Sequence, residues 1–244
     1  MPIDLVYLTS DRRNHYQHEE LRYSLRSVGK HLSGVKGVHV IGVRPAWIQG
    51  VNFIEMNDSF IKNKDANIIN KVIFACSQPE ISNPFLFIND DHFLLQDCKA
   101  RLFPYYCAER LVGNSPNGKY RERVNNTRSL LEAEGLPIKN YDVHTPIVIH
   151  RNHFLPVMAK YPWDTERGPG VVMKSLYGNN CPWIKGTIVR DRKFSHKRPG
   201  PVEDLEKLLQ GSPCFSVTSR VSGVLWQLLG KLYPKPSRYE GGDE

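Results

Sequence analysis

The stretch Phe85-Leu86-Phe87-Ile88-Asn89-Asp90-Asp91-His92-Phe93-Leu94 decides how this chain is interpreted. Its four leading apolar residues predict a buried strand that is too short to cross a membrane. Two carboxylates and an imidazole follow at once, and adjacent acids usually stay ionised only near a cation. Because ligands of open α/β sheets bind beyond the carboxyl ends of the strands, we expect Mg²⁺ or Mn²⁺ and its bound phosphates here. The alternative is an ordinary turn, since Asn and Asp are also common turn residues.

Strands and helices alternate around this stretch through the first hundred residues. Apolar, β-rich runs predict strands over 3–8, 38–43 and 51–56, and helical spacing of apolar residues predicts helices over 19–32 and 65–76. This alternation is typical of a doubly wound α/β sheet.

The second half follows no such alternation. The residue pattern there predicts a polar, mobile loop over 114–126, a strand over 141–150, a glycine-rich binding loop over 163–180 and helical structure after 201. No repeat or linker divides the chain, so we expect one continuous domain.

The composition narrows the class of protein and of partner. Its 244 residues are 40% hydrophobic and 24% charged, as in soluble globular proteins. The five cysteines are widely spaced and form no Cys-x-x-Cys pair, which argues against a zinc site or a disulfide framework. Together with the absence of a signal-peptide pattern, this favours a reducing cytoplasm. The net charge of +8 favours an anionic partner: nucleotide phosphates, nucleic acid or an anionic glycan. Six cations over 185–198 could bind a diphosphate or a nucleic-acid backbone, or form a solvated loop.

Three segments together resemble a known family. The helix 20–28 (Glu-Leu-Arg-Tyr-Ser-Leu-Arg-Ser-Val), Pro45-Ala46-Trp47-Ile48, and the acidic stretch at 87–94 are similar to the central conserved region of the Stealth proteins. Those proteins are sugar-phosphate transferases of capsule synthesis, related to the lysosomal-enzyme N-acetylglucosamine phosphotransferase. Residues 141–146 match a later region more weakly, and 232–240 resemble the end of small bacterial and phage glycosyltransferase-like chains.

The resemblance implies a fold and a division of the chain. We expect an α/β fold with a GT-A-like, Rossmann-type mixed sheet flanked by helices in a single domain. Residues 1–100 would form the nucleotide-sugar-binding half, 101–233 the acceptor side, and 234–244 a polar tail. The family's Trp-Val-Asp-Gly-Ser-Asp type segment is replaced here by Leu8-Thr9-Ser10-Asp11-Arg12-Arg13, which leaves open whether a sugar or a sugar phosphate is transferred.

The expected chemistry is metal-dependent transfer from a nucleotide-sugar donor, with a UDP-sugar as the expected donor and Mn²⁺ or Mg²⁺ stabilising the leaving phosphate. The predicted metal ligands are Asp91, Asp90, His144 and His196. The predicted donor-binding residues are Thr9, Ser10, Asp11, Arg26, Asn70, Lys71, Asp90 and Lys197, and the predicted catalytic residues are Asp142, His144 and Arg22. Asp142 and His144 would share one face of a strand as an acid/base pair, or else satisfy each other in the core.

Two acceptor classes and two other functions stay open. One of these functions is a phosphatase or nuclease that uses the same Asp pair, although the sequence offers no convincing second cluster of carboxylates for it. The family points to a glycan or lipid-linked glycan as the acceptor. The basic charge also fits an enzyme that modifies hydroxymethylated bases in phage-type DNA, with the duplex backbone held by cations and the base flipped out. The alternative is a non-enzymatic protein that binds nucleic acid or an anionic glycan on the same fold.

Overall fold

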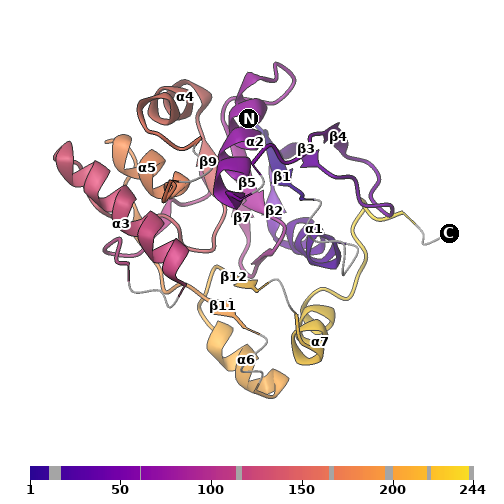
Figure 1. Cartoon of the computed structure of the whole chain (residues 1–244). Coiled ribbons are helices and arrows are strands. Elements are labelled where there is room, and N and C mark those ends of the chain that lie inside the picture. The colour runs from indigo at the N-terminus through magenta and orange to yellow at the C-terminus, as the bar shows by residue number, and fades with distance from the viewer. Residues whose placement is uncertain are drawn as a thin grey trace.

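A five-stranded sheet of order β4-β3-β1-β5-β9 forms the centre of the protein (Figure 1). The computed structural model describes residues 1–10, 18–60, 62–113, 117–164, 168–195, 200–218 and 221–241. The strands of this sheet are β1 (Ile3–Leu8), β3 (Val35–Gly42), β4 (Asn52–Glu55), β5 (Phe85–Asn89) and β9 (Ile147–Ile149). The first four run parallel, and β9 is antiparallel to β5. The mixed α/β sheet predicted from the sequence is therefore confirmed.

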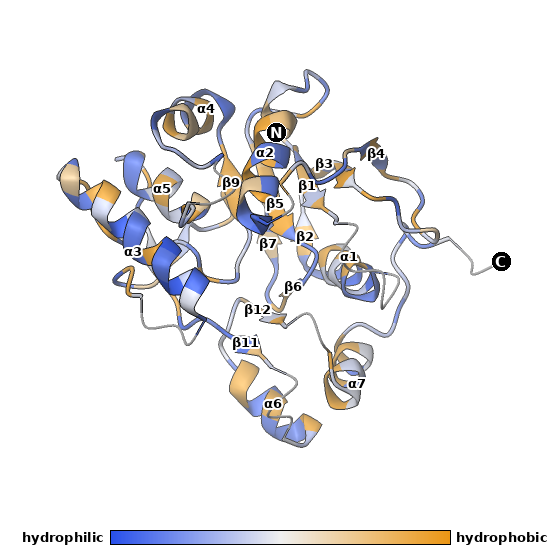
Figure 2. Ribbon diagram, in the orientation of Figure 1, coloured by the Kyte–Doolittle hydropathy of each residue, from blue (hydrophilic) through white to orange (hydrophobic). Residues whose placement is uncertain are grey.

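Helices cover both faces of this sheet because its central strands are apolar on both sides. Leu5 and Tyr7 of β1 pack toward α1 (Glu19–His31), through the helix residues Leu21 and Leu25. Val6 and Leu8 pack into the opposite cluster, formed with α2 (Lys64–Ser77), α3 (Gly118–Ala133), α4 (Arg151–Lys160) and α5 (Met173–Asn180). The central strands are accordingly hydrophobic in Figure 2, whereas α3 is banded with hydrophilic residues.

A smaller unit continues from the acidic turn after β5. There β6 (His92–Leu94) pairs antiparallel with β12 (Cys214–Val217), which pairs with β11 (Lys193–Phe194). Helices α6 (Val202–Leu209) and α7 (Gly223–Leu232) pack on it through a separate apolar cluster that includes Phe93 and Phe215. Two short parallel pairs complete the strands: β8 (Tyr106–Cys107) pairs with β10 (Thr187–Ile188), and β2 (Leu32–Ser33) pairs with β7 (Cys98–Lys99). A short 3-10 helix, η2 (Ala100–Leu102), follows β7.

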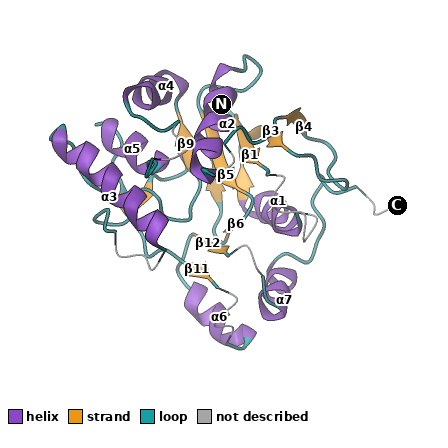
Figure 3. Ribbon diagram, in the orientation of Figure 1, coloured by secondary structure: helices purple, strands orange, loops and turns teal. Residues whose placement is uncertain are grey.

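The elements predicted for the first hundred residues are confirmed, but several in the second half were wrong. Residues 118–126 belong to α3 rather than to a loop, because Asn117 caps the helix and Val124, Thr127 and Leu131 form a buried stripe. Residues 173–180 form the buried helix α5 rather than a binding loop. The predicted strand over 141–150 is reduced to β9, and β12 interrupts the helical structure after 201 (Figure 3).

Residues 233–241, most of which were predicted as a polar tail, pack against α1. Tyr239 is buried, and Glu240 accepts hydrogen bonds from Arg26 Nε and Nη2 at 2.9 and 2.6 Å. Ile48 forms a backbone bridge to Glu240, so this segment also holds the chain before β4. Among the described residues, no helix has both the length and the apolar character needed to span a membrane.

Candidate active site

Polar residues follow two neighbouring parallel strands at the same edge of the sheet. Leu8, the last residue of β1, is paired with Asn89, the last residue of β5. Thr9 and Ser10 follow the first strand, and Asp90 and Asp91 follow the second. All four line one cavity of about 180 Å³. The strand pairing therefore brings the two predicted polar ends together.

The β1 side of the cavity is held by a buried ion pair. Lys71 Nζ of α2 donates to Asp58 Oδ1 and to the Thr9 carbonyl, both at 2.7 Å, and the two charged side chains are 4% and 9% exposed. Ser10 Oγ donates to the other oxygen of Asp58 at 2.9 Å, and Thr9 Oγ1 donates to the Val43 carbonyl at 2.7 Å. The Lys71–Asp58 pair thus fixes Thr9 and Ser10, the two residues that follow β1.

The β5 side carries the acidic turn. Asp90 and Asp91 are buried, and Asp91 Oδ1 lies 3.9 Å from His92 Nε2. Burial lowers the pKa of His92 well below its ordinary value, although the charge of Asp91 opposes this shift. His92 is therefore neutral at pH 7, and its ring stands edge-on to His144 with the centroids 6.2 Å apart.

The third side comes from the segment before β9, where Asp142 and His144 also line the cavity. The strand argument for placing them on one face was wrong, because residues 141–145 form no strand and 143–145 are a bend. Tertiary contacts hold them instead. Asp142 Oδ2 accepts a hydrogen bond from Tyr120 Oη of α3 at 2.8 Å.

His144 lies between a carboxylate and an ammonium group. Asp191 accepts from the His144 backbone N–H at 3.0 Å and lies 2.7 Å from His144 Nδ1. Lys193 Nζ lies 2.8 Å from His144 Nε2. An ammonium can only donate, so this arrangement requires the ring proton on Nδ1 and an unprotonated Nε2. Burial alone would raise the pKa of Asp191, but the hydrogen bonds from His144 outweigh it and lower that pKa below its usual value.

A buried lysine fixes the turn that carries His144. Lys174 Nζ of α5 donates to the backbone carbonyls of Val143 and, at 3.2 Å, Thr145. Burial lowers the pKa of Lys174, while Asp142 and Asp191 oppose the shift. Carbonyls on both sides of His144 are thereby tied to one buried ammonium.

A further carboxylate in the cavity wall, Asp65, has a raised pKa because of burial, although Arg123 Nη2 lies 2.6 Å away. Asp142 adds a like charge that acts in the same direction. The wall therefore contains an acid that holds its proton more strongly than an exposed aspartate.

Other predicted site residues lie away from this cavity or outside the described residues. Arg26 pairs with Glu240, and the Arg22 guanidinium lies 4.8 Å from the centroid of the Trp47 ring. Asn70 donates to Ser59 Oγ at 3.4 Å and does not line the cavity. Asp11, His196 and Lys197 lie outside the described residues.

Sequence reasoning missed several residues that the fold brings to the site: Asp58, Lys64, Asp65, Lys174, Asp191 and Lys193. Lys193 had a signal, because it belongs to the basic segment 185–198. Asp191 and Asp58 had none, since each meets its partner only through tertiary structure.

The donor atoms present suit a divalent metal only in part. Within the described ranges, no group of three or more His, Cys, Asp and Glu residues is arranged to hold a metal ion. Asp90 and Asp91 offer the carboxylate oxygens that Mg²⁺ and Mn²⁺ prefer. His144 fits poorly as a third ligand, because Asp191 and Lys193 occupy its two nitrogens.

Comparison with known proteins gives one curated relative and several solved structures. No protein-family model matches the sequence. Xyloside xylosyltransferase 1 from mouse superposes with a TM-score of 0.43 at 9% identity, covering 91% of this chain and all of that one. The glycosyltransferase GlyE of Streptococcus pneumoniae TIGR4 gives 0.42 at 11% identity, covering 98% of this chain and 66% of that one.

The curated relative is the exopolysaccharide phosphotransferase SCO6023 of Streptomyces coelicolor. The two sequences are 25% identical over an alignment 266 positions long, which covers 91% of this chain and 45% of that protein. The chain is thus similar to a bacterial exopolysaccharide phosphotransferase along nearly all of its own length, while it spans less than half of that protein.

Proposed function

We propose that this protein is a transferase that takes a sugar or a sugar phosphate from a nucleotide-sugar donor and attaches it to a hydroxyl group. The observation that carries the proposal is the cavity at the edge of the sheet that collects Asp90, Asp91, Asp142 and His144, with Asp191 bonded to His144 Nδ1. Similarity to an exopolysaccharide phosphotransferase supports it, and favours sugar-phosphate transfer to a glycan.

Cations around the cavity suit the donor diphosphate. Lys64 and Lys193 line it, and Lys193 lies on β11 opposite the acidic turn. Developing negative charge on a leaving phosphate is stabilised best by fixed cations in a site that excludes water. Thr9 and Ser10, held by the Lys71–Asp58 pair, would contact the nucleoside.

A divalent cation would be held by Asp91 and Asp90, together with the donor phosphates, and would supply electrostatic stabilisation of the leaving group. His144 does not belong to this ligand set in our proposal, because its nitrogens are already engaged. Of the two functional roles predicted for this histidine, metal ligand and acid/base catalyst, our proposal keeps the second.

His144 acts as the general base. Asp191 keeps the ring proton on Nδ1, so Nε2 can accept the proton of the acceptor hydroxyl once Lys193 turns toward the donor phosphate. In sugar-phosphate transfer, the acceptor oxygen bonds to the β-phosphorus and the bond from that phosphorus to the bridging oxygen breaks, releasing a nucleoside monophosphate. In sugar transfer, the oxygen bonds to the anomeric carbon and a nucleoside diphosphate leaves.

The first test measures thermal stabilisation by nucleotide-sugars, each with and without Mn²⁺. Binding to the native state raises the melting temperature by mass action, and we expect a metal-dependent rise with one donor that is lost in Asp91→Ala. His144→Gln should still bind that donor and lose turnover. Metal-independent binding would refute the metal assignment, and no binding of any donor would favour a non-enzymatic anion-binding protein.

Product analysis then separates the two reactions. Release of the nucleoside monophosphate identifies sugar-phosphate transfer, and release of the diphosphate identifies sugar transfer. A UDP-sugar as donor, a DNA acceptor and a cytoplasmic location stay predictions, so both glycan oligomers and hydroxymethylated duplex DNA should be offered as acceptors.

A further inference from the structure

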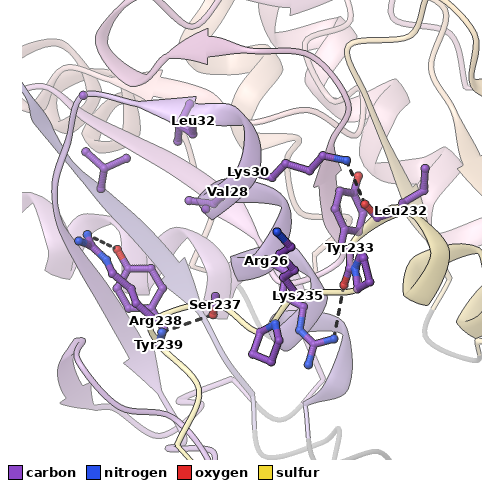
Figure 4. A pocket seen from close by; sticks show the side chains of 15 residues that line it. Arg26, Val28, Lys30, Leu32, Leu232, Tyr233, Lys235, Ser237, Arg238 and Tyr239 are labelled. Carbon is purple, nitrogen blue, oxygen red and sulfur yellow. Dashed lines mark hydrogen bonds between the residues drawn. The ribbon is translucent and has the colours of Figure 1, made fainter.

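A second cavity, of about 780 Å³, lies between the end of α1 and residues 232–239 (Figure 4). Gly34 lines it and accepts a hydrogen bond from the backbone N–H of Ile3, at the amino end of β1. The candidate active site begins beyond Leu8, at the other end of that strand. Six residues of strand separate the two by about 16 Å. We call this cavity the α1 groove.

The walls of the α1 groove are apolar and its rim is basic. The wall residues include Val28, Leu32, Val35, Pro234, Pro236 and Tyr239. Lys30, Lys235 and Arg238 stand on the rim, and all three are exposed. Among the described residues, none that lines the α1 groove is acidic.

These rim cations are not neutralised by acids. Lys30 Nζ donates to the Leu232 carbonyl at 3.1 Å, and Arg238 Nη2 donates to Tyr239 Oη at 2.7 Å, both seen in Figure 4. In the described part of the chain, none of the three forms an ion pair with a carboxylate. Arg26 differs, because Glu240 already pairs with it.

The groove continues around the end of α1. A neighbouring hollow of about 490 Å³ shares Gly29, Lys30 and Leu32 with it and extends to Lys99. Its lining also contains Asp97, whose carboxylate lies 2.8 Å from His31 Nδ1. The two linings together hold Lys30, Lys235, Arg238 and Lys99 against this one carboxylate. A basic surface that extends over two adjoining hollows suits a linear polyanion better than a compact ligand.

We propose that the α1 groove binds a linear, polyanionic glycan. The exposed rings of Pro234 and Pro236 offer apolar surfaces to sugar rings, while Lys30, Lys235 and Arg238 meet charges along the glycan chain. The inference rests on the proposed function, because repeated sugar-phosphate transfer makes a polymer with one negative charge at each phosphodiester. The distal part of such a chain lies in the groove while its growing end reaches the active site.

The test is a direct binding titration of the full chain with a fluorescently labelled oligogalacturonate. A neutral malto-oligosaccharide of equal length is the ligand control. The groove variant is Lys235→Glu/Arg238→Glu, and Arg110→Glu/Lys119→Glu makes the same change of net charge at exposed positions outside the groove. We expect the groove variant to weaken binding about tenfold or more, and the control variant less than about twofold.

Several results would overturn the inference: equal losses in both variants, equal binding of the neutral glycan, or stronger binding of dodecyl phosphate or single-stranded DNA. Failure of the proposed function is separable, since the titration needs neither donor nor turnover. Asp91→Asn should bind the oligogalacturonate as the natural sequence does. Donor turnover without glycan binding refutes the groove alone, and glycan binding without recognition of any donor refutes the transferase alone.

Discussion

Replacing Lys71 by methionine tests whether the Lys71–Asp58 pair organises the β1 side of the site. Methionine keeps most of the apolar stem of the lysine but removes the ammonium group. Among the described residues, the Ser10 hydroxyl is then the remaining hydrogen-bond donor to the Asp58 carboxylate. It also takes the donor from the Thr9 carbonyl. Both side chains of the pair are less than a tenth exposed, so hydrogen bonds to water cannot readily replace the lost ones.

Removing one partner of a buried ion pair costs about 3–5 kcal/mol. For a chain of this size, that lowers the melting temperature by roughly 6–20 °C. Urea unfolding should show the loss as a shifted midpoint with an unchanged slope. The double variant Lys71→Met/Asp58→Asn should recover part of the loss, because no buried charge is then left unpaired.

The matched control is Lys36→Met. Lys36 Nζ lies 3.4 Å from Asp4 Oδ2, but the Lys36 side chain is 59% exposed. Its loss should cost less than about 1 kcal/mol. If Lys71→Met costs no more than Lys36→Met, the pair does not hold the loop and the reasoning fails.

Three further predictions concern residues outside that pair. Asp191→Asn should destabilise the protein at neutral pH. The folded-state pKa of Asp191 lies below its unfolded value of about 3.9. The loss of stability caused by the substitution should therefore be largest above about pH 5 and vanish as the pH falls through the folded-state pKa. A loss of melting temperature that does not depend on pH would contradict this. Gly178→Ala should lower the free energy of unfolding by about 1–3 kcal/mol, because the added carbon would lie 2.4 Å from Tyr141 Cδ2. The carbon added by Gly29→Ala meets nothing within 4 Å, so that variant should be more stable by about 0.5–1 kcal/mol. Equal effects of the two substitutions in chemical denaturation would refute the packing argument. Asn117→Ala should cost about 1 kcal/mol by removing the cap of α3, and circular dichroism during thermal unfolding would show whether that cap matters.

The first half was predictable because its local pattern and its tertiary role agree. The strands β1 and β5 are apolar on both faces, and α1 shows a clear stripe of Leu21, Leu25 and Val28. Polar residues at the ends of parallel strands meet by geometry alone. For that reason, the sequence could place Thr9, Ser10, Asp90 and Asp91 together.

The second half was harder because its elements depend on distant partners. Helix α3 buries only Val124, Thr127 and Leu131, a stripe too sparse to stand out in a polar segment. Helix α5 contains Gly178 because the Tyr141 ring packs against it, so a residue typical of loops is required there by packing. Asp191 lies 47 residues from His144, and no spacing rule predicts that contact.

The hydrogen bonds between Arg26 and Glu240 join residues 214 positions apart. During synthesis at about 5–20 residues per second, α1 emerges roughly ten to forty seconds before its partner. Over that interval, the face of α1 later covered by Tyr233 and Tyr239 stays open to chaperones or to other nascent chains. The α1 groove therefore forms only after residues 232–239 have been made, well after the synthesis of strands β1 and β5, whose ends carry part of the candidate active site.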